Sequence, residues 1–207
     1  MRSAPLSHRP RRVDRRGAAG VRRRPLDNPP WVTEVIAVFA RIPEEHERMR
    51  LAVELARENV LCETGGPFGA VIVEERSGEL VAVGVNGVER LRSSLAHAEV
   101  VALAEAEARL ASYSLAAGPE RLALYTSCEP CAMCLGAILW SGISRVVYAA
   151  RREDAEAIGF DEGPPLRDPA AHLRDRGIVL EEGPFREEAA AVLRAYVERG
   201  GTVYNGS

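Results

Sequence analysis

The hydrophobic and polar positions of this chain follow two periods, one typical of helices and one typical of buried strands. From Pro43 onward, apolar residues recur every three or four positions, which predicts a helix that Gly65-Gly66-Pro67 ends. Continuous apolar runs at 68–74 and 80–85, separated by Ser77-Gly78, predict an antiparallel pair of strands. The body of the chain therefore opens with a helix and a strand pair.

The rest of the body alternates helices with single strands. A short apolar stretch at 31–42 predicts a helix or a docking strand, and residues 159–168 form a Gly/Pro-rich loop. The order of the elements predicts an α/β fold, a three-layer α-β-α sandwich with a mixed central sheet. The expected helices lie at about 96–110, 130–140, 151–157 and 187–199, and the expected strands at 122–126, 145–149 and 178–180.

Charge divides the chain near residue 30. Residues 1–30 hold nine arginines and two aspartates, a net charge of +7, whereas the whole chain carries −3, so residues 31–207 carry −10. A segment so rich in Arg, Pro and Gly predicts a disordered N-terminal extension over 1–30, with a transit peptide or a loose basic arm as alternatives. The acidic body would repel a polyanion, so a nucleic-acid partner is not expected.

Three of the four cysteines, Cys128, Cys131 and Cys134, lie within seven residues. This spacing is unlike that of a secreted disulfide framework and favours a reducing cytoplasm and a metal. A catalytic zinc takes three protein ligands and keeps a fourth position open, and His97 with the C-x-x-C pair would supply the three. No run of apolar residues is long enough to cross a membrane.

Glu99 follows His97 by two residues. On a regular helix this separation is about 200° around the axis, so the two are not a same-face ligand pair. In the first turn of a helix the carboxylate can still face the same cleft, beside an activated water and without binding metal. It could then take the proton of the attacking water and return it to a leaving nitrogen, which predicts a catalytic role for Glu99.

Other interpretations of the cysteines remain open. A lone C-x-x-C also occurs in redox pairs and in structural zinc sites, and Cys128 extends the pair toward an iron–sulfur pattern. The fourth cysteine, Cys62, is distant, so we interpret Cys128 as a buried small residue. The joint pattern H-x-E followed by P-C-x-x-C favours a hydrolytic zinc site. The non-enzyme alternative is a structural-zinc interaction domain.

Several short stretches resemble one known family. They are GGPFGAV at 65–71, AHAEV at 96–100, LYTSCEPC at 124–131, MCLGAI at 133–138, YAA at 148–150 and GFD at 159–161. Together they resemble the cytidine deaminase-like superfamily of zinc-dependent deaminases, and within it the bacterial guanine deaminases. The resemblance covers about half of the chain. It implies the cytidine deaminase-like fold, one zinc per subunit, a homodimer, and hydrolysis of guanine to xanthine and ammonia in the cytoplasm.

The same resemblance implies roles for further residues. Asn86 matches the asparagine that recognises the base, although Asn86-Gly87 is also a turn dipeptide. Glu162 matches a second acid that relays protons, or is an exposed loop carboxylate. Phe68 packs on the base or joins the core. Tyr204 resembles an aromatic tail residue that closes the site, often across a swapped dimer, and the alternative is a frayed terminus.

Two departures from the family leave the choice of base open. Ser93-Ser94 stands where the family commonly has Asp-Pro, and Gly87 replaces a common second asparagine. A tRNA adenosine deaminase, or a deaminase of cytosine or a triazine, is therefore an alternative. Compared with the tRNA enzymes, the motif at 126–131 is one residue longer and the tail carries no net charge, which favours a free nucleobase. Residues 31–182 would form the deaminase domain, and 183–207 a helix and tail that close the site of their own or a partner subunit.

Overall fold

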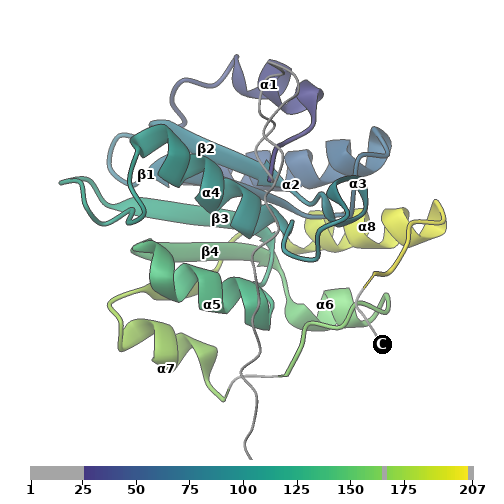
Figure 1. Ribbon diagram of the computed structural model, residues 1–207. Coiled ribbons are helices and arrows are strands. Elements are labelled where there is room, and N and C mark those ends of the chain that lie inside the picture. The colour runs from purple at the N-terminus through teal and green to yellow at the C-terminus, as the bar shows by residue number, and fades with distance from the viewer. Residues whose placement is uncertain (1–25, 165–166, 205–207) are drawn as a thin grey trace, which may run out of the picture.

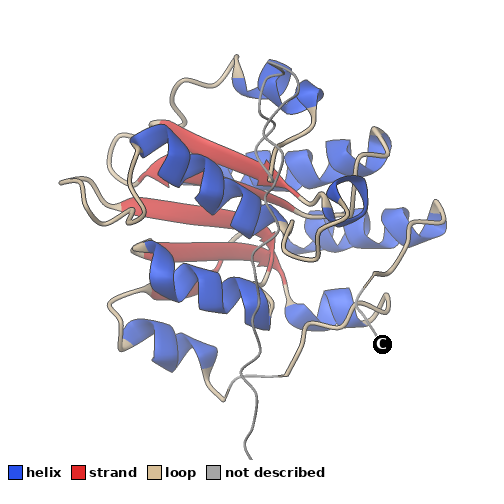
Figure 2. Ribbon diagram, viewed as in Figure 1, coloured by secondary structure: helices blue, strands red, loops and turns tan. Residues whose placement is uncertain are grey.

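The computed structural model describes residues 26–164 and 167–204. A five-stranded sheet lies between two layers of helices, which confirms the predicted three-layer α/β sandwich (Figures 1 and 2). In chain order the elements are α1 (Pro30–Ile36), α2 (Glu45–Leu61), β1 (Gly69–Glu74), β2 (Leu80–Val85), α3 (Val88–Leu91), α4 (Ala98–Leu110), β3 (Leu122–Cys128), α5 (Ala132–Ser141), β4 (Arg145–Ala150), α6 (Arg152–Glu156), α7 (Pro169–Arg174), β5 (Val179–Glu182) and α8 (Arg186–Glu198).

The sheet is mixed, with the strand order β2-β1-β3-β4-β5. Strand β1 runs antiparallel to both of its neighbours, whereas β3, β4 and β5 are parallel to one another. Strands β2, β3 and β4 therefore point the same way, and their carboxyl ends meet the amino end of β1 at one edge of the sheet. In open α/β sheets this carboxyl edge is where ligands bind.

Helices cover both faces of the sheet. Helices α2 and α8 pack on one face and against each other, while α4 and α5 pack on the other and α7 lies beside β5 (Figure 1). Strands β2 and β3 are buried along their whole length. Burial on both faces explains why these strands appear in the sequence as continuous apolar runs instead of alternating ones.

Helix α4 approaches β2 closely at Gly84. A Cβ atom at this position would lie 2.1 Å from the carbonyl oxygen of Ala98 and 2.5 Å from the amide nitrogen of Ala102. A side chain here would push α4 away from the sheet. The glycine therefore sets the distance between the sheet and the start of the helix that follows His97.

Replacing Gly84 by alanine is expected to lower the free energy of unfolding by about 1–3 kcal/mol, the usual cost of overpacking a core. Gly136 in α5 is the matched control, because a Cβ there meets nothing within 4 Å. Gly136→Ala is expected to stabilise the protein by about 0.5–1 kcal/mol through helix propensity. Denaturant unfolding of both variants measures the two effects, and equal effects would contradict the close contact.

Several elements differ from the sequence prediction. The short helices α3 and α7 were not predicted, and β5 begins and ends later than expected. The predicted disordered extension over 1–30 lies mostly outside the described residues. Its described end, residues 26–30, is not detached, because the Asn28 side chain hydrogen-bonds to β2. In the part of the chain that the structure describes, no helix is long and apolar enough to span a membrane.

Candidate active site

The three predicted metal ligands lie together at the carboxyl edge of the sheet. The ligand atoms of His97, Cys131 and Cys134 are all within 4.8 Å of one another. Nδ1 of His97 lies 3.5 Å from Sγ of Cys131 and 3.6 Å from Sγ of Cys134. Zinc bond lengths and a tetrahedral angle place such a nitrogen and sulfur about 3.6 Å apart. The donor set and its spacing therefore fit zinc.

Two helix starts position these ligands. His97 is the N-cap residue of α4, Cys131 is the N-cap residue of α5, and Cys134 lies in the first turn of α5. Neither N-cap side chain makes a capping hydrogen bond. Both side chains are thus free to face the metal, and the positive end of α5 favours thiolate.

The two thiols of the pair differ in acidity. The pKa of Cys131 is lowered to about 4, first because Cys134 donates a hydrogen bond to it and then because of His97. The same hydrogen bond, together with burial, raises the pKa of Cys134 well above its usual value. Without metal the pair therefore shares one proton, and zinc binding has to displace it. Burial lowers the pKa of His97, but its hydrogen bond with Cys131 and the charge of Glu99 outweigh burial and raise it.

Two buried carboxyls line the same pocket as the ligands His97 and Cys131. Glu99 and Glu162 are each only 6% exposed. Burial, then the charge of Cys131, raises the pKa of Glu99 to about 7 and that of Glu162 to about 8. The backbone carbonyl of Glu162 accepts a hydrogen bond from Ala132, which ties the loop after α6 to the start of α5. The alternative interpretation of Glu162 as an exposed loop carboxylate is therefore wrong.

Asn86 follows β2 directly and is 1% exposed. Its Oδ1 accepts hydrogen bonds from the backbone N–H groups of Gly66 (3.3 Å) and Val88 (3.2 Å). Among the described residues its Nδ2 has no hydrogen-bond partner, although it is buried in the wall of the pocket. The side chain thus makes the turn with its oxygen and still presents a free N–H donor.

Three aromatic rings close the pocket. Phe160 makes edge-to-face contacts with Phe68 and with Tyr204, with ring centroids 5.2 Å apart in both pairs. Tyr204 lies in the pocket of its own chain, and a Cβ at Gly66 would meet its hydroxyl at 2.3 Å. The remaining cavity is about 20 Å³, which is room for about one water molecule.

Phe160 stands at the centre of the aromatic contacts, although it is not among the site residues that the sequence predicts. The available signal was an aromatic residue two positions before Glu162 in a Gly/Pro-rich loop. Asn59 was also missed, because a polar residue on the apolar face of α2 gives no pattern. Cys128 is buried at the end of β3 as predicted, and is not among the three clustered ligands. Cys62 is exposed.

Comparison with known proteins finds both guanine and tRNA enzymes. Guanine deaminase of Bacillus subtilis is 47% identical over 114 residues, which are 55% of this chain and 69% of that protein. The tRNA-specific adenosine deaminase of Buchnera aphidicola is 32% identical over 127 residues, which are 61% of this chain and 77% of that protein.

Solved structures agree in fold. A structure of NE0047 in complex with 2,6-diaminopurine is 41% identical, covers 87% of this chain and 95% of that one, and has a TM-score of 0.81. A structure of guanine deaminase from Nitrosomonas europaea is 41% identical, covers 83% and 94%, and has a TM-score of 0.79. Residues 43–150 match the family described as the cytidine and deoxycytidylate deaminase zinc-binding region. With the ligand geometry, this match shows that the chain belongs to the zinc-dependent cytidine and deoxycytidylate deaminase family.

Proposed function

We propose that this protein hydrolyses guanine to xanthine and ammonia. The observation that carries the proposal is one pocket lined by the zinc ligands His97 and Cys131, by two buried acids and by Asn86. The side-chain amide N–H of Asn86 has no partner among the described residues. Deamination of a purine base requires these groups. A group beside the amino group has to accept and donate protons, and a polar group has to contact an edge of the ring. The relatives named guanine deaminase and the solved complex with 2,6-diaminopurine support the same substrate class.

His97, Cys131 and Cys134 would hold the zinc. When bound there, zinc supplies a Lewis acid that makes water acidic enough to attack at neutral pH. Two thiolates and a neutral imidazole balance the charge of the ion. Because Cys134 resists ionisation without metal, loading is expected to release a proton and to weaken at low pH.

Glu99 would take the proton of the attacking water and return it to the departing amino group. Burial raises its pKa to about 7 when no metal is bound, and a carboxyl in such a site can both accept and donate a proton. Burial and the charge of Cys131 raise the pKa of Glu162 to about 8 when no metal is bound, and its protonated form would pass a proton to the purine. A C–O bond forms at the amino-bearing carbon, the C–N bond breaks, and nitrogen leaves as ammonia. The proton that remains on the new C–O group would return to Glu162, so both carboxyls end in their starting protonation states.

Aromatic side chains would hold the base. Phe68, Phe160 and Tyr204 surround the pocket, and stacking on such rings is favourable for any base. The cavity of about 20 Å³ is too small for a purine, so the tail that carries Tyr204 has to open for entry. Tyr204 would then close over the base and exclude water.

Asn86 would read the base through its free amide. Replacement by alanine is expected to cost about 1–3 kcal/mol in transition-state binding, which lowers kcat/KM by about 5- to 150-fold. Asn86→Asp separates the two roles, because it keeps an oxygen for Gly66 and Val88 but removes the amide N–H. Steady-state kinetics on both variants should give similar losses. Recovery of activity in the aspartate variant alone would assign Asn86 to the turn.

Ammonia release decides between the candidate substrates. Zinc-loaded protein would be offered guanine, adenine, cytosine, guanosine and a tRNA anticodon stem. We expect release from guanine to be fastest and release from the RNA stem to be absent, since the body is acidic. Release from the RNA alone would refute the proposal in favour of a tRNA adenosine deaminase.

We also propose that two chains pair in the cytoplasm. Trp140 at the end of α5 is 80% exposed, and aromatic residues are enriched at protein interfaces relative to the rest of the surface. The cysteines are free, and the metal needs the thiols of Cys131 and Cys134 reduced. Sedimentation tests whether two chains pair, and a monomer at micromolar concentration would refute the pairing. Cell fractionation tests the location in the cytoplasm.

A further inference from the structure

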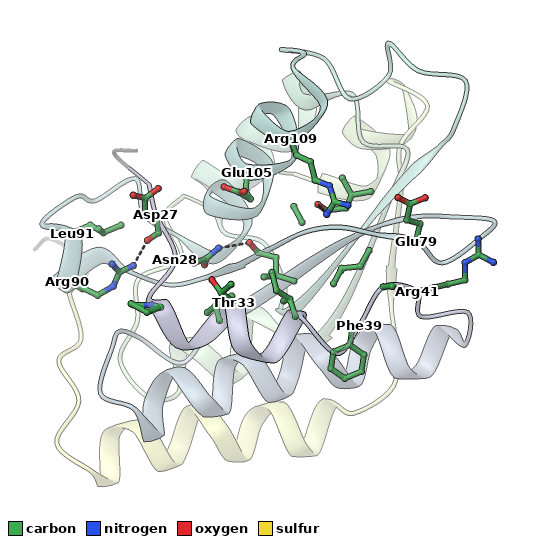
Figure 3. Close-up of a pocket in the computed structure, with 18 residues that line it drawn as sticks. Asp27, Asn28, Thr33, Phe39, Arg41, Glu79, Arg90, Leu91, Glu105 and Arg109 are labelled. Carbon is green, nitrogen blue, oxygen red and sulfur yellow. Dashed lines mark hydrogen bonds between the residues drawn. The ribbon is translucent and has the colours of Figure 1, made fainter. Parts of the chain in front are cut away.

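A short segment that precedes the family-matched residues 43–150 forms hydrogen bonds with β2 and α3, the elements that flank Asn86. We call residues Asp27–Trp31 the N-terminal strap; they precede the matched region, which begins at residue 43. The strap runs along β2, the edge strand of the sheet, and forms one wall of a cavity of about 810 Å³ (Figure 3). Since the cavity leaves this side of the strap loosely packed, its hydrogen bonds matter for its position.

Two of these bonds are made by Asn28. Its Nδ2 donates to the carbonyl of Val83 (2.9 Å), and its Oδ1 accepts from the backbone N–H of Val85 (3.0 Å). The side-chain amide thus pairs with the outer edge of β2 as a neighbouring strand would. Val85 is the residue directly before Asn86, so this contact fixes the chain where it enters the turn.

A second contact holds the chain where it leaves the turn. Arg90 of α3 donates a hydrogen bond to the backbone carbonyl of Asp27 (Figure 3). Helix α3 begins at Val88, whose N–H bonds to the side chain of Asn86. The strap therefore contacts the elements on both sides of Asn86.

A third contact reaches Asn86 through the interior. The indole N–H of Trp31 donates to Oγ1 of Thr64 (3.0 Å), and that hydroxyl donates to Oδ1 of Asn59 (2.7 Å). Asn59 is 0% exposed, and its Nδ2 donates to the carbonyls of Asn86 and Gly66, each at 2.8 Å. This relay is complete, because each polar group of the Asn59 amide has a partner.

The relay leaves little freedom for Asn86. Asn59 holds its backbone carbonyl, Phe68 accepts from its N–H, and Gly66 donates to its Oδ1. A Cβ at Gly65 would lie 1.9 Å from the Asn86 carbonyl, so this packing requires glycine. The side chain of Asn86, which lines the pocket and has a free Nδ2, is therefore held in one orientation.

We propose that the N-terminal strap is a positioning element for base recognition, acting through Val85, Asn59 and α3 to hold the amide of Asn86 toward the substrate. The inference rests on the proposed function, in which Asn86 reads guanine. A preorganised donor costs less to order on binding, so loosening the strap raises KM and leaves the proton transfers unchanged.

Two strap variants and one control test this role. Asn28→Ala removes both bonds to β2, and Trp31→Phe removes the indole N–H while keeping a ring. Arg109→Met is the control, since Arg109 bonds to Val81 on the same strand but at the end far from Asn86. Each strap variant is expected to raise KM for guanine about 3- to 10-fold, the scale of one hydrogen bond, with kcat and zinc content unchanged. The control should leave KM unchanged.

Amide hydrogen exchange supplies a measurement that needs no substrate. The N–H groups of Gly66 and Val88 both bond to the Asn86 side chain, so they report its freedom. Their exchange should accelerate about 3- to 10-fold in both strap variants and not in Arg109→Met. The inference would be overturned if KM and exchange stayed unchanged in the strap variants, or if the control had an equal effect. It would also be overturned if the strap variants lost both kcat and bound zinc. If no variant and no wild-type protein acts on guanine, the proposed function fails, while faster exchange still supports the positioning role.

Discussion

Glu99→Gln is expected to keep zinc and to lower kcat by about 10²- to 10⁴-fold, the usual range for a lost general acid–base group. Glutamine has nearly the same shape as glutamate, so the pocket keeps its form. It cannot accept a proton from water or return one to the amino group. This buried carboxyl lies two residues from the ligand His97 and lines the same pocket, so it is placed to make both transfers.

The control for this variant lies on the same helix. Glu107 is eight residues further along α4 and outside the pocket, so Glu107→Gln should keep wild-type turnover. Zinc content by atomic absorption and single-turnover kinetics separate metal loss from lost proton transfer. Near wild-type turnover by zinc-loaded Glu99→Gln would remove Glu99 from the mechanism.

Cys134→Ser is expected to lower zinc affinity by more than about 100-fold, because changes even outside the ligand shell cost 10- to 100-fold. Serine keeps the size of the side chain but is a poor zinc ligand at neutral pH. Activity should fall with the metal content. Dialysis against a weak chelator, followed by measurement of zinc per chain, gives the comparison with wild type.

Cys128→Ala tests whether the effect belongs to the ligand set. Cys128 is buried at the end of β3, its Sγ 3.7 Å from the carbonyl of Arg151, and it is not in the cluster of ligand atoms. This variant should keep one zinc per chain. Loss of metal from both variants would favour the interpretation of the three cysteines as an iron–sulfur motif. Retention of zinc by Cys134→Ser would contradict the proposed ligands.

The predicted strands and long helices agree with the structure where hydrophobic period and glycine or proline punctuation coincide. Strand β2 spans the predicted residues 80–85, and α8 lies within one residue of its prediction. The four-residue α3 and six-residue α7 are too short to show a period. Strand β5 was misplaced because its end carries Glu181 and Glu182, which pair with Arg145 and Arg151 on the neighbouring strand and beyond it.

The starts of the two helices at the metal site could not be predicted from N-cap preferences. The sequence predicts that these helices begin at about Ala96 and at Pro130, whereas α4 and α5 begin after His97 and Cys131. Neither histidine nor cysteine is a favoured N-cap, and here neither caps its helix. A residue type chosen for metal binding therefore hides the end of the element that carries it.

The strap was missed for a different reason. Asn28 lay inside the predicted disordered extension, and its bonds to Val83 and Val85 join positions 55 and 57 residues apart. Composition within a short window contains no information about such pairs. The metal ligands could be predicted because each belongs to a short motif, H-x-E or P-C-x-x-C, although the two motifs lie 34 residues apart. The support of Asn86 has no such motif and depends on tertiary contacts.

One labelling experiment tests the central claim most directly. Zinc-loaded protein would be incubated with guanine in water enriched in ¹⁸O. Mass spectrometry would give the mass of the product, and the amount of ammonia released would be measured in parallel. Hydrolytic deamination requires xanthine that carries one ¹⁸O and one ammonia per xanthine. Unlabelled product, or guanine left unchanged by a fully zinc-loaded protein that deaminates another base, would contradict it.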